Sequence, residues 1–239
     1  MCTVVVRVGD AGEPVRMLAV RDEDPTRPWR PFGRRWPEYP AIAGVRDELA
    51  GGAWLALDAA RGRLGVVVNI EGVPDVPRIT SRGALALDVA LDRPLPEAPT
   101  TEGFHLVQVS PDGVRVTTWD GRDLRHRPLG PGTHLVTHAP VDDPRDPRTG
   151  TWLPRFAEAA TVGEPWWQAW AAVLGESAQL PNDDERAIIR DNHVHGYPTV
   201  TLMAAFLEIG AGRTTVDSTV LEHPGRWPSA PRWTHMVLP

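Results

Sequence analysis

The chain contains no lysine and only one cysteine in 239 residues. The absence of lysine excludes mechanisms that need its amine, such as a pyridoxal phosphate Schiff base, a P-loop or a Ser-Lys dyad. One cysteine excludes an intramolecular disulfide framework and is compatible with a reducing cytosol. We therefore expect a cytoplasmic protein. Because every basic residue other than histidine is arginine, the composition also indicates a GC-rich bacterial genome.

Long apolar runs and a positive net charge are also missing. No run approaches the ~18 residues of a membrane-spanning helix, and the start of the chain lacks the basic-then-apolar pattern of a signal peptide. The net charge of -6 argues against a nucleic-acid partner, because phosphate contacts need a basic surface. We expect no membrane span and a small-molecule substrate or ligand. With no internal repeat or break in composition, residues 1–239 are expected to form a single domain.

The single cysteine is the second residue, Cys2. Removal of Met1 would make Cys2 the first residue, which would then carry a thiol nucleophile on its side chain and a free α-amine on its backbone. That amine titrates near pH ~8, so it can act as the base that takes the thiol proton. The alternative is a small apolar residue at the start of a strand. Position alone does not decide between the two.

Apolar alternation and turn residues predict a mostly antiparallel β protein with separate runs of helix. Strands are expected at 3–6, 15–20, 53–57, 64–69, 104–110, 113–119, 134–137, 199–209 and 214–223. Helices are expected at about 80–91, 152–161 and 165–174. Residues 26–40 and the tail from 224 are expected to be irregular because they are rich in proline. This order indicates an α+β sandwich of two stacked sheets with helices outside.

Ten tryptophans against four phenylalanines and two tyrosines favour core filling, with a broad ligand groove as the alternative. In Asp191-Asn192-His193-Val194-His195, a strand would put both histidines on one face and allow a metal site. That signal is weak, and we expect no metal. His105, His126 and His134 are expected at the surface or at strand ends.

Arg21 and Asp22 follow the second expected strand. If the first two strands form a hairpin, both residues lie at the same end of the sheet as Cys2. An arginine there favours a thiolate, and an acid orients an α-amine. The alternative is a salt-bridged surface loop.

Six segments in the first ~70 residues carry a family resemblance. They are Met1-Cys2-Thr3, Val20-Arg21-Asp22-Glu23, Arg27-Pro28-Trp29, Gly44-Val45-Arg46-Asp47, the run from Ala50 to Ala56, and Val68-Asn69. In these segments the chain resembles the NRDE family, which includes the transport and Golgi organisation 2 proteins. The similarity is specific over the first ~70 residues and diffuse afterwards.

The resemblance implies an N-terminal nucleophile (Ntn) hydrolase-like αββα sandwich, related to the choloylglycine hydrolases. It implies that Cys2 is the nucleophile, with Arg21 and either Asp22 or Asp24 beside it. It also implies that Asn69 stabilises an oxyanion and that His138 stands where the family has a later Asn.

Two functions follow from the resemblance. The first is an N-terminal-cysteine amidohydrolase or acyltransferase acting on a small amide or acyl substrate, in an apolar pocket lined by Trp-rich loops. The alternative is a non-enzymatic protein that binds or traffics haem or an acyl lipid, with Cys2 or a histidine touching the ligand. No cofactor is expected, apart from haem as a ligand in the second case.

Overall fold

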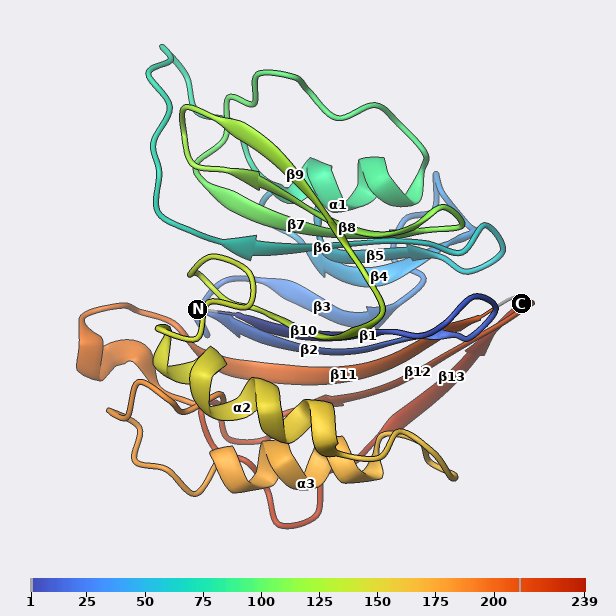
Figure 1. The fold of residues 1–239 in the computed structure, drawn as a ribbon. Coiled ribbons are helices and arrows are strands. Elements are labelled where there is room, and N and C mark those ends of the chain that lie inside the picture. Colours follow the sequence, from blue (N-terminus) through green and yellow to red (C-terminus); the bar gives the residue numbers. More distant parts are fainter. Residues whose placement is uncertain (1, 211) are drawn as a thin grey trace.

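Two antiparallel sheets stack face to face, and helices cover the outer face of each sheet (Figure 1). The computed structural model describes residues 2–210 and 212–239. Met1 and Ala211 lie outside the described residues, and with them the first residue of the Met1-Cys2 pair and one residue between the strands expected at 199–209 and 214–223. The α+β class with two antiparallel sheets is confirmed.

Sheet A contains the two termini of the described chain and has six strands. In spatial order they are β10 (Gly132–Val136), β1 (Thr3–Val8), β2 (Val15–Glu23), β11 (Val200–Gly210), β12 (Arg213–Val220) and β13 (Thr234–Leu238). Sheet B has seven strands, which follow one another in sequence. They are β3 (Trp29–Gly33), β4 (Ile42–Asp47), β5 (Ala53–Asp58), β6 (Arg63–Asn69), β7 (Phe104–Ser110), β8 (Gly113–Trp119) and β9 (Leu124–Leu129).

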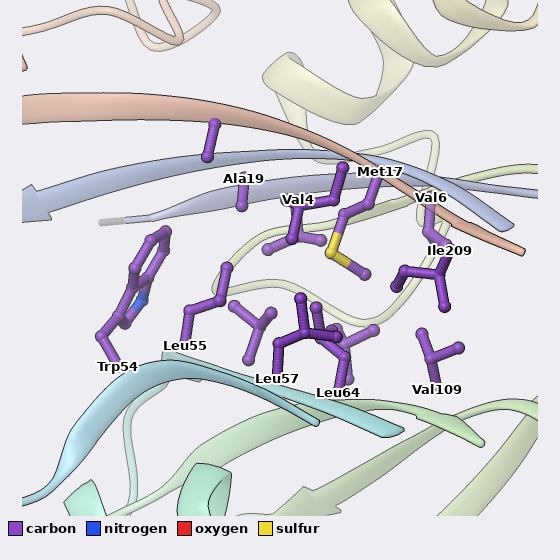
Figure 2. Packing of buried hydrophobic residues seen from close by; sticks show 14 of the residues in the cluster. Val4, Val6, Met17, Ala19, Trp54, Leu55, Leu57, Leu64, Val109 and Ile209 are labelled. Carbon is purple, nitrogen blue, oxygen red and sulfur yellow. The ribbon is translucent and has the colours of Figure 1, made fainter. Parts of the chain in front are cut away.

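The central strands are apolar on both faces because each face is covered. In β1, Val4 and Val6 point into the core between the sheets, whereas Val5 points to the helices outside sheet A. In Figure 2, Val4, Val6 and Met17 from sheet A face Leu57 and Leu64 from sheet B. Side chains alternate between the faces of a strand, so this register is fixed by two apolar layers at once. Each fully buried aliphatic side chain contributes about 1.5–3 kcal/mol.

Three α-helices form the outer layers. The helix α1 (Gly83–Ala90) packs on sheet B, and α2 (Pro147–Glu158) and α3 (Gln168–Ser177) cover sheet A (Figure 1). The α2 helix starts at Asp146, whose carboxylate accepts a hydrogen bond from the Thr149 N–H at 2.9 Å. A 3-10 helix, η1 (Asn192–His195), precedes β11.

The tryptophans mainly fill the layer between sheet A and its helices, so the core-filling interpretation is confirmed. Six of the ten belong to this cluster, and several pack edge-to-face or stacked on Phe206. They are Trp152, Trp166, Trp167, Trp170, Trp227 and Trp233.

The prediction of irregular structure at 26–40 and after 224 is confirmed over 34–40 and 224–233 and wrong over Trp29–Gly33 and Thr234–Leu238. β3 lies in the first segment and β13 in the second, and β4 and β9 were also missed. Three of these four are edge strands, where one backbone side is free and apolar alternation is weak. Pro31 is tolerated in β3 because an edge strand needs fewer backbone donors, and the β3–β4 register shifts between Arg30 and Gly33.

None of the helices in the described part of the chain combines the length and apolarity that crossing a membrane requires.

A contact between two glycines sets the distance of α1 from sheet B. A Cβ at Gly52 would lie 2.4 Å from the backbone of Gly83, at the start of α1. We expect Gly52→Ala to push α1 outward and to lower the free energy of unfolding by about 1–3 kcal/mol. Urea titration followed by tryptophan fluorescence measures this. Gly130→Ala is the control, since a Cβ there meets nothing within 4 Å. Equal stability of the two variants would contradict the close-approach argument.

Candidate functional site

Cys2 lies at the start of β1, beside the end of β2. The register pairs Thr3 with Val20, so Arg21 and Asp22 continue β2 next to Cys2. The Cys2 side chain is 5% exposed, and its Sγ–H donates to the backbone carbonyl of Asp22, with Sγ and O 3.6 Å apart. Burial, followed by the negative charge of Asp22, raises the pKa of the thiol. The Arg21-Asp22 pair therefore lies inside the β strand and beside Cys2, and not in a surface loop.

Two adjoining pockets open at this end of the sandwich, and they share Cys2, Asp22, Glu23 and Asn69. The first has a volume of about 380 Å³, and the second about 220 Å³. Arg21 lines the first pocket and His138 lines the second. All five residues predicted from sequence as a site therefore meet around one cavity system, although they come from four separate segments of the chain.

The first pocket, which we call the Cys2 pocket, is strongly charged. Its lining includes three arginines and four acidic residues, namely Arg21, Arg27, Arg82, Asp22, Glu23, Asp47 and Glu102. The expected Trp-rich lining is wrong, because Trp54 is the one tryptophan among the described residues that line either pocket. Most tryptophans instead point into the layer outside sheet A.

The arginines of the Cys2 pocket are held by acidic neighbours. Arg27 makes a salt bridge to Asp47 at 2.7 Å, and Arg82 makes one to Glu102 at 3.0 Å. Arg21 donates from Nη2 to Glu23 at 3.1 Å, and its guanidinium lies 5.5 Å from the centre of the Trp54 ring. The charges are thus largely compensated within the pocket, which suits a polar ligand without a large net charge.

Asp22 is the acidic residue of the site, and Asp24 is not. The Asp22 carboxylate is buried and accepts hydrogen bonds from Thr201 Oγ1 at 2.7 Å and from Asn192 Nδ2 at 3.3 Å. Asp24 lines neither pocket, and it accepts its hydrogen bonds from Thr26 in the following turn. Of the two acids that the resemblance left open, the structure thus places Asp22, and not Asp24, beside Cys2.

Asn69 and His138 complete the wall. Asn69 is the exposed last residue of β6 in sheet B, facing both pockets from the sheet opposite Cys2. His138 follows β10, which pairs with β1, and it is exposed at the rim of the second pocket. A side-chain amide from one sheet and a thiol from the other therefore approach the same cavity.

The sequence reasoning missed a buried polar cluster behind Asp22. Arg148 and Arg190 are 1% and 3% exposed. Burial lowers the pKa of both guanidinium groups, and the negative charge of Asp22 opposes this shift in part. Arg148 Nη1 donates to Thr3 Oγ1 at 2.7 Å. Nothing in an arginine-rich sequence separates these two arginines from surface ones. Thr201 could have been found from the sequence, because pairing of the strand expected at 199–209 with β2 places Thr201 opposite Asp22.

Residues Asp191 to His195 do not form the strand on which a metal site there would depend. These residues form the N-cap and body of η1, and the Asp191 carboxylate contacts both the backbone N–H and the ring of His193. Over residues 2–210 and 212–239 no group of three or more His, Cys, Asp or Glu side chains is arranged to hold a metal ion.

His105 is buried at 3% exposure and is the second residue of β7, so it lies at a strand end and not at the surface, the two positions expected from the sequence. Its Nε2 lies 2.9 Å from the carbonyl of Ala139, and its Nδ1 lies 2.7 Å from Thr118 Oγ1. A carbonyl only accepts, so Nε2 carries the proton and Nδ1 accepts from the threonine hydroxyl. Burial lowers the pKa of His105 to about 4. This neutral histidine anchors the backbone next to His138.

Comparison with protein-family models finds none that matches the chain, and comparison with curated proteins finds no significant match.

The His105 pKa predicts acid sensitivity. Its folded pKa of about 4 lies below the ordinary value of 6.5, so the unfolded state binds the proton first. The stabilisation is fully present above pH 6.5 and is lost as the pH falls through 4, on the order of 3 kcal/mol in all. Urea unfolding at several pH values should show this loss in the wild type and a smaller loss in His105→Gln. Parallel pH profiles for the two proteins would contradict the assignment.

Proposed function

We propose that this protein is an N-terminal-cysteine hydrolase or acyltransferase that cleaves a small polar amide. The observation that carries the proposal is the meeting of Cys2, Arg21, Asp22, Asn69 and His138 around two adjoining pockets. The position of Cys2 and of Arg21-Asp22, and a resemblance to a family that is similar to the Ntn hydrolases, predict these residues from the sequence. The stacked sheets with helices on both outer faces support the proposal further, because an Ntn hydrolase-like sandwich has these layers.

In the proposed reaction, Cys2 is the first residue of the mature chain. Its Sγ attacks the amide carbonyl carbon and forms a C–S bond, while the thiol proton moves to the α-amine of the same residue. The C–N bond then breaks, and the leaving amine takes that proton from the α-ammonium group. Water hydrolyses the thioester and releases the acid; with an acceptor amine in place of water, the product is a new amide.

The neighbouring side chains have separate roles in this mechanism. Asn69 donates its side-chain N–H to the oxygen of the tetrahedral intermediate, an interaction worth roughly 3 kcal/mol in comparable sites. The Asp22 carboxylate, fixed by Thr201 and Asn192, orients the α-amine. Arg21 offsets the negative charge of Asp22 beside the thiol. Its positive charge lowers the pKa of Cys2, whereas Asp22 raises it.

The charged lining of the Cys2 pocket guides the choice of substrate. An acyl lipid or haem would have to bury apolar surface against these ionic side chains, which is unfavourable. A small amide with polar groups on both sides of the scissile bond can instead exchange hydrogen bonds with the paired acids and arginines. We therefore favour a hydrolase of polar amides over a haem or lipid carrier.

The first test concerns maturation. Intact-mass measurement shows whether residue 1 is absent from the purified protein. A chain that keeps residue 1 should react with iodoacetamide more slowly than a free cysteine peptide at pH ~7.5, because Cys2 is buried and its pKa is raised. A chain beginning at Cys2 should react faster than the peptide. Retention of residue 1 in the cellular protein, or slow alkylation of both forms, would sink the mechanism.

The second test concerns catalysis. A panel of small polar p-nitroanilides is screened for release of nitroaniline, together with intact-mass detection of an acyl group on Cys2. We expect Cys2→Ala to abolish the adduct and lower the rate at least about 10³-fold, and Asn69→Ala to lower kcat about 10²-fold. Asn182→Ala, an exposed asparagine far along the chain, should keep full activity. Turnover that survives Cys2→Ala would refute the assigned nucleophile.

A further inference from the structure

A separate pocket, away from the two around Cys2, lies on sheet B near the edge strand β3 and its neighbour β4. Its charge pattern differs from that of the Cys2 pocket. It has a volume of about 400 Å³, within the usual range for small-molecule sites. We call it the arginine pocket. Its lining consists of Arg30, Arg34, Arg35, Trp36, Pro37, Pro40, Arg46 and Glu48. It shares no lining residue with the Cys2 pocket.

Two of these arginines face each other across the strands. Arg30 of β3 is the direct partner of Arg46 of β4 in the antiparallel register. Like charges directly opposite each other destabilise a strand pair. Glu48 offsets one of them through a 2.8 Å salt bridge to Arg30, which leaves Arg46 uncompensated. The positive charge of Arg46 is therefore available to a ligand at this edge of the sheet.

Three of the four arginines, Arg34, Arg35 and Arg46, donate hydrogen bonds to backbone oxygens and not to carboxylates. Arg46 Nη1 donates to the carbonyl of Arg35 at 2.6 Å, Arg35 Nε donates to the carbonyl of Pro31 at 2.9 Å, and Arg34 donates to the carbonyl of Pro40. In the described part of the chain, no salt bridge joins Arg34, Arg35 or Arg46 to an acid. Arg46 Nε is buried and has no hydrogen-bond partner.

These contacts pre-organise the guanidinium groups without neutralising them. The pocket contains four arginines and one glutamate in a chain whose net charge is -6. The Cys2 pocket differs, because each arginine there faces an acid. Uncompensated arginines in a concave site match the oxygens of an anion, which they bind through paired N–H donors.

We propose that the arginine pocket binds the phosphate group of a small phosphate monoester. A phosphate dianion offers several acceptor oxygens to Arg34, Arg35 and Arg46. The rings of Pro37 and Pro40, beside the buried Trp36, form an apolar wall for the organic part of the ester. The overall negative charge of the chain disfavours a long polyanion such as nucleic acid.

Isothermal titration calorimetry of the full chain with phenyl phosphate, at low ionic strength, tests this proposal. We expect saturable binding with one site per chain, weaker binding of inorganic phosphate, and a loss of affinity as salt is added. The Cys2→Ala variant should bind phenyl phosphate as the wild type does, so the result is independent of the proposed hydrolase. Equal affinity for inorganic phosphate would overturn the ester assignment and leave the ion alone as the ligand.

Variants locate the binding. Arg46→Gln and Arg34→Gln should each weaken phenyl phosphate binding about tenfold, as expected for the loss of a charge-assisted hydrogen bond. The exposed Arg34 provides the test if Arg46→Gln does not fold, which a thermal melt reveals. Arg122→Gln, an exposed arginine on another loop, matches the change in net charge and should have no effect. Absence of saturable binding, or equal weakening by all three variants, would overturn the proposal.

Discussion

The antiparallel pairing of β1 with β2 is the constraint on which the site depends. Its register places Thr3 opposite Val20, which carries the chain past Val20 into Arg21 and Asp22 beside Cys2. A shift by one residue would turn Val4 and Val6 away from the core between the sheets, so the apolar layers fix the register. The position of the thiol relative to the carboxylate thus follows from core side chains that line neither pocket.

The buried charged cluster behind Cys2 needs hydrogen-bond partners from the protein itself. Asp22, Arg148 and Arg190 lie where water does not compensate them, so each needs hydrogen bonds from the protein. Thr201 supplies part of this, since its hydroxyl donates to Asp22 while it accepts from the backbone N–H of Arg190. One threonine of β11 therefore connects the acid of the site to the segment that leads into η1. Such a cluster is weak evidence for stability and better evidence for a fixed geometry.

The sequence predicted the central strands well and the edges poorly, for a physical reason. β1, β2, β6 and β7 are covered on both faces, and their dense apolar runs record that burial. β9, with Arg125, His126 and Arg127, lies at an edge and looks like a loop. Cys2, Arg21 and Asp22 could be found from their positions along the chain, and Asn69 and His138 from the family resemblance. Arg148 and Arg190 could not be found, because burial of an arginine leaves no local pattern. The polarity of the Cys2 pocket was missed because it depends on which face each tryptophan takes.

The electrostatics around Cys2 indicate how a reactive thiol could arise. Burial raises the pKa of the thiol, so at neutral pH Cys2 holds its proton, and that state is a poor nucleophile. Arg21 opposes this effect but is itself partly engaged by Glu23. The pocket therefore does not activate cysteine by making a stable thiolate, as sites with an adjacent histidine do. In the proposed reaction a base must therefore remove the proton during attack, and the α-amine of a chain that begins at Cys2 lies on the same residue and has a suitable ordinary pKa.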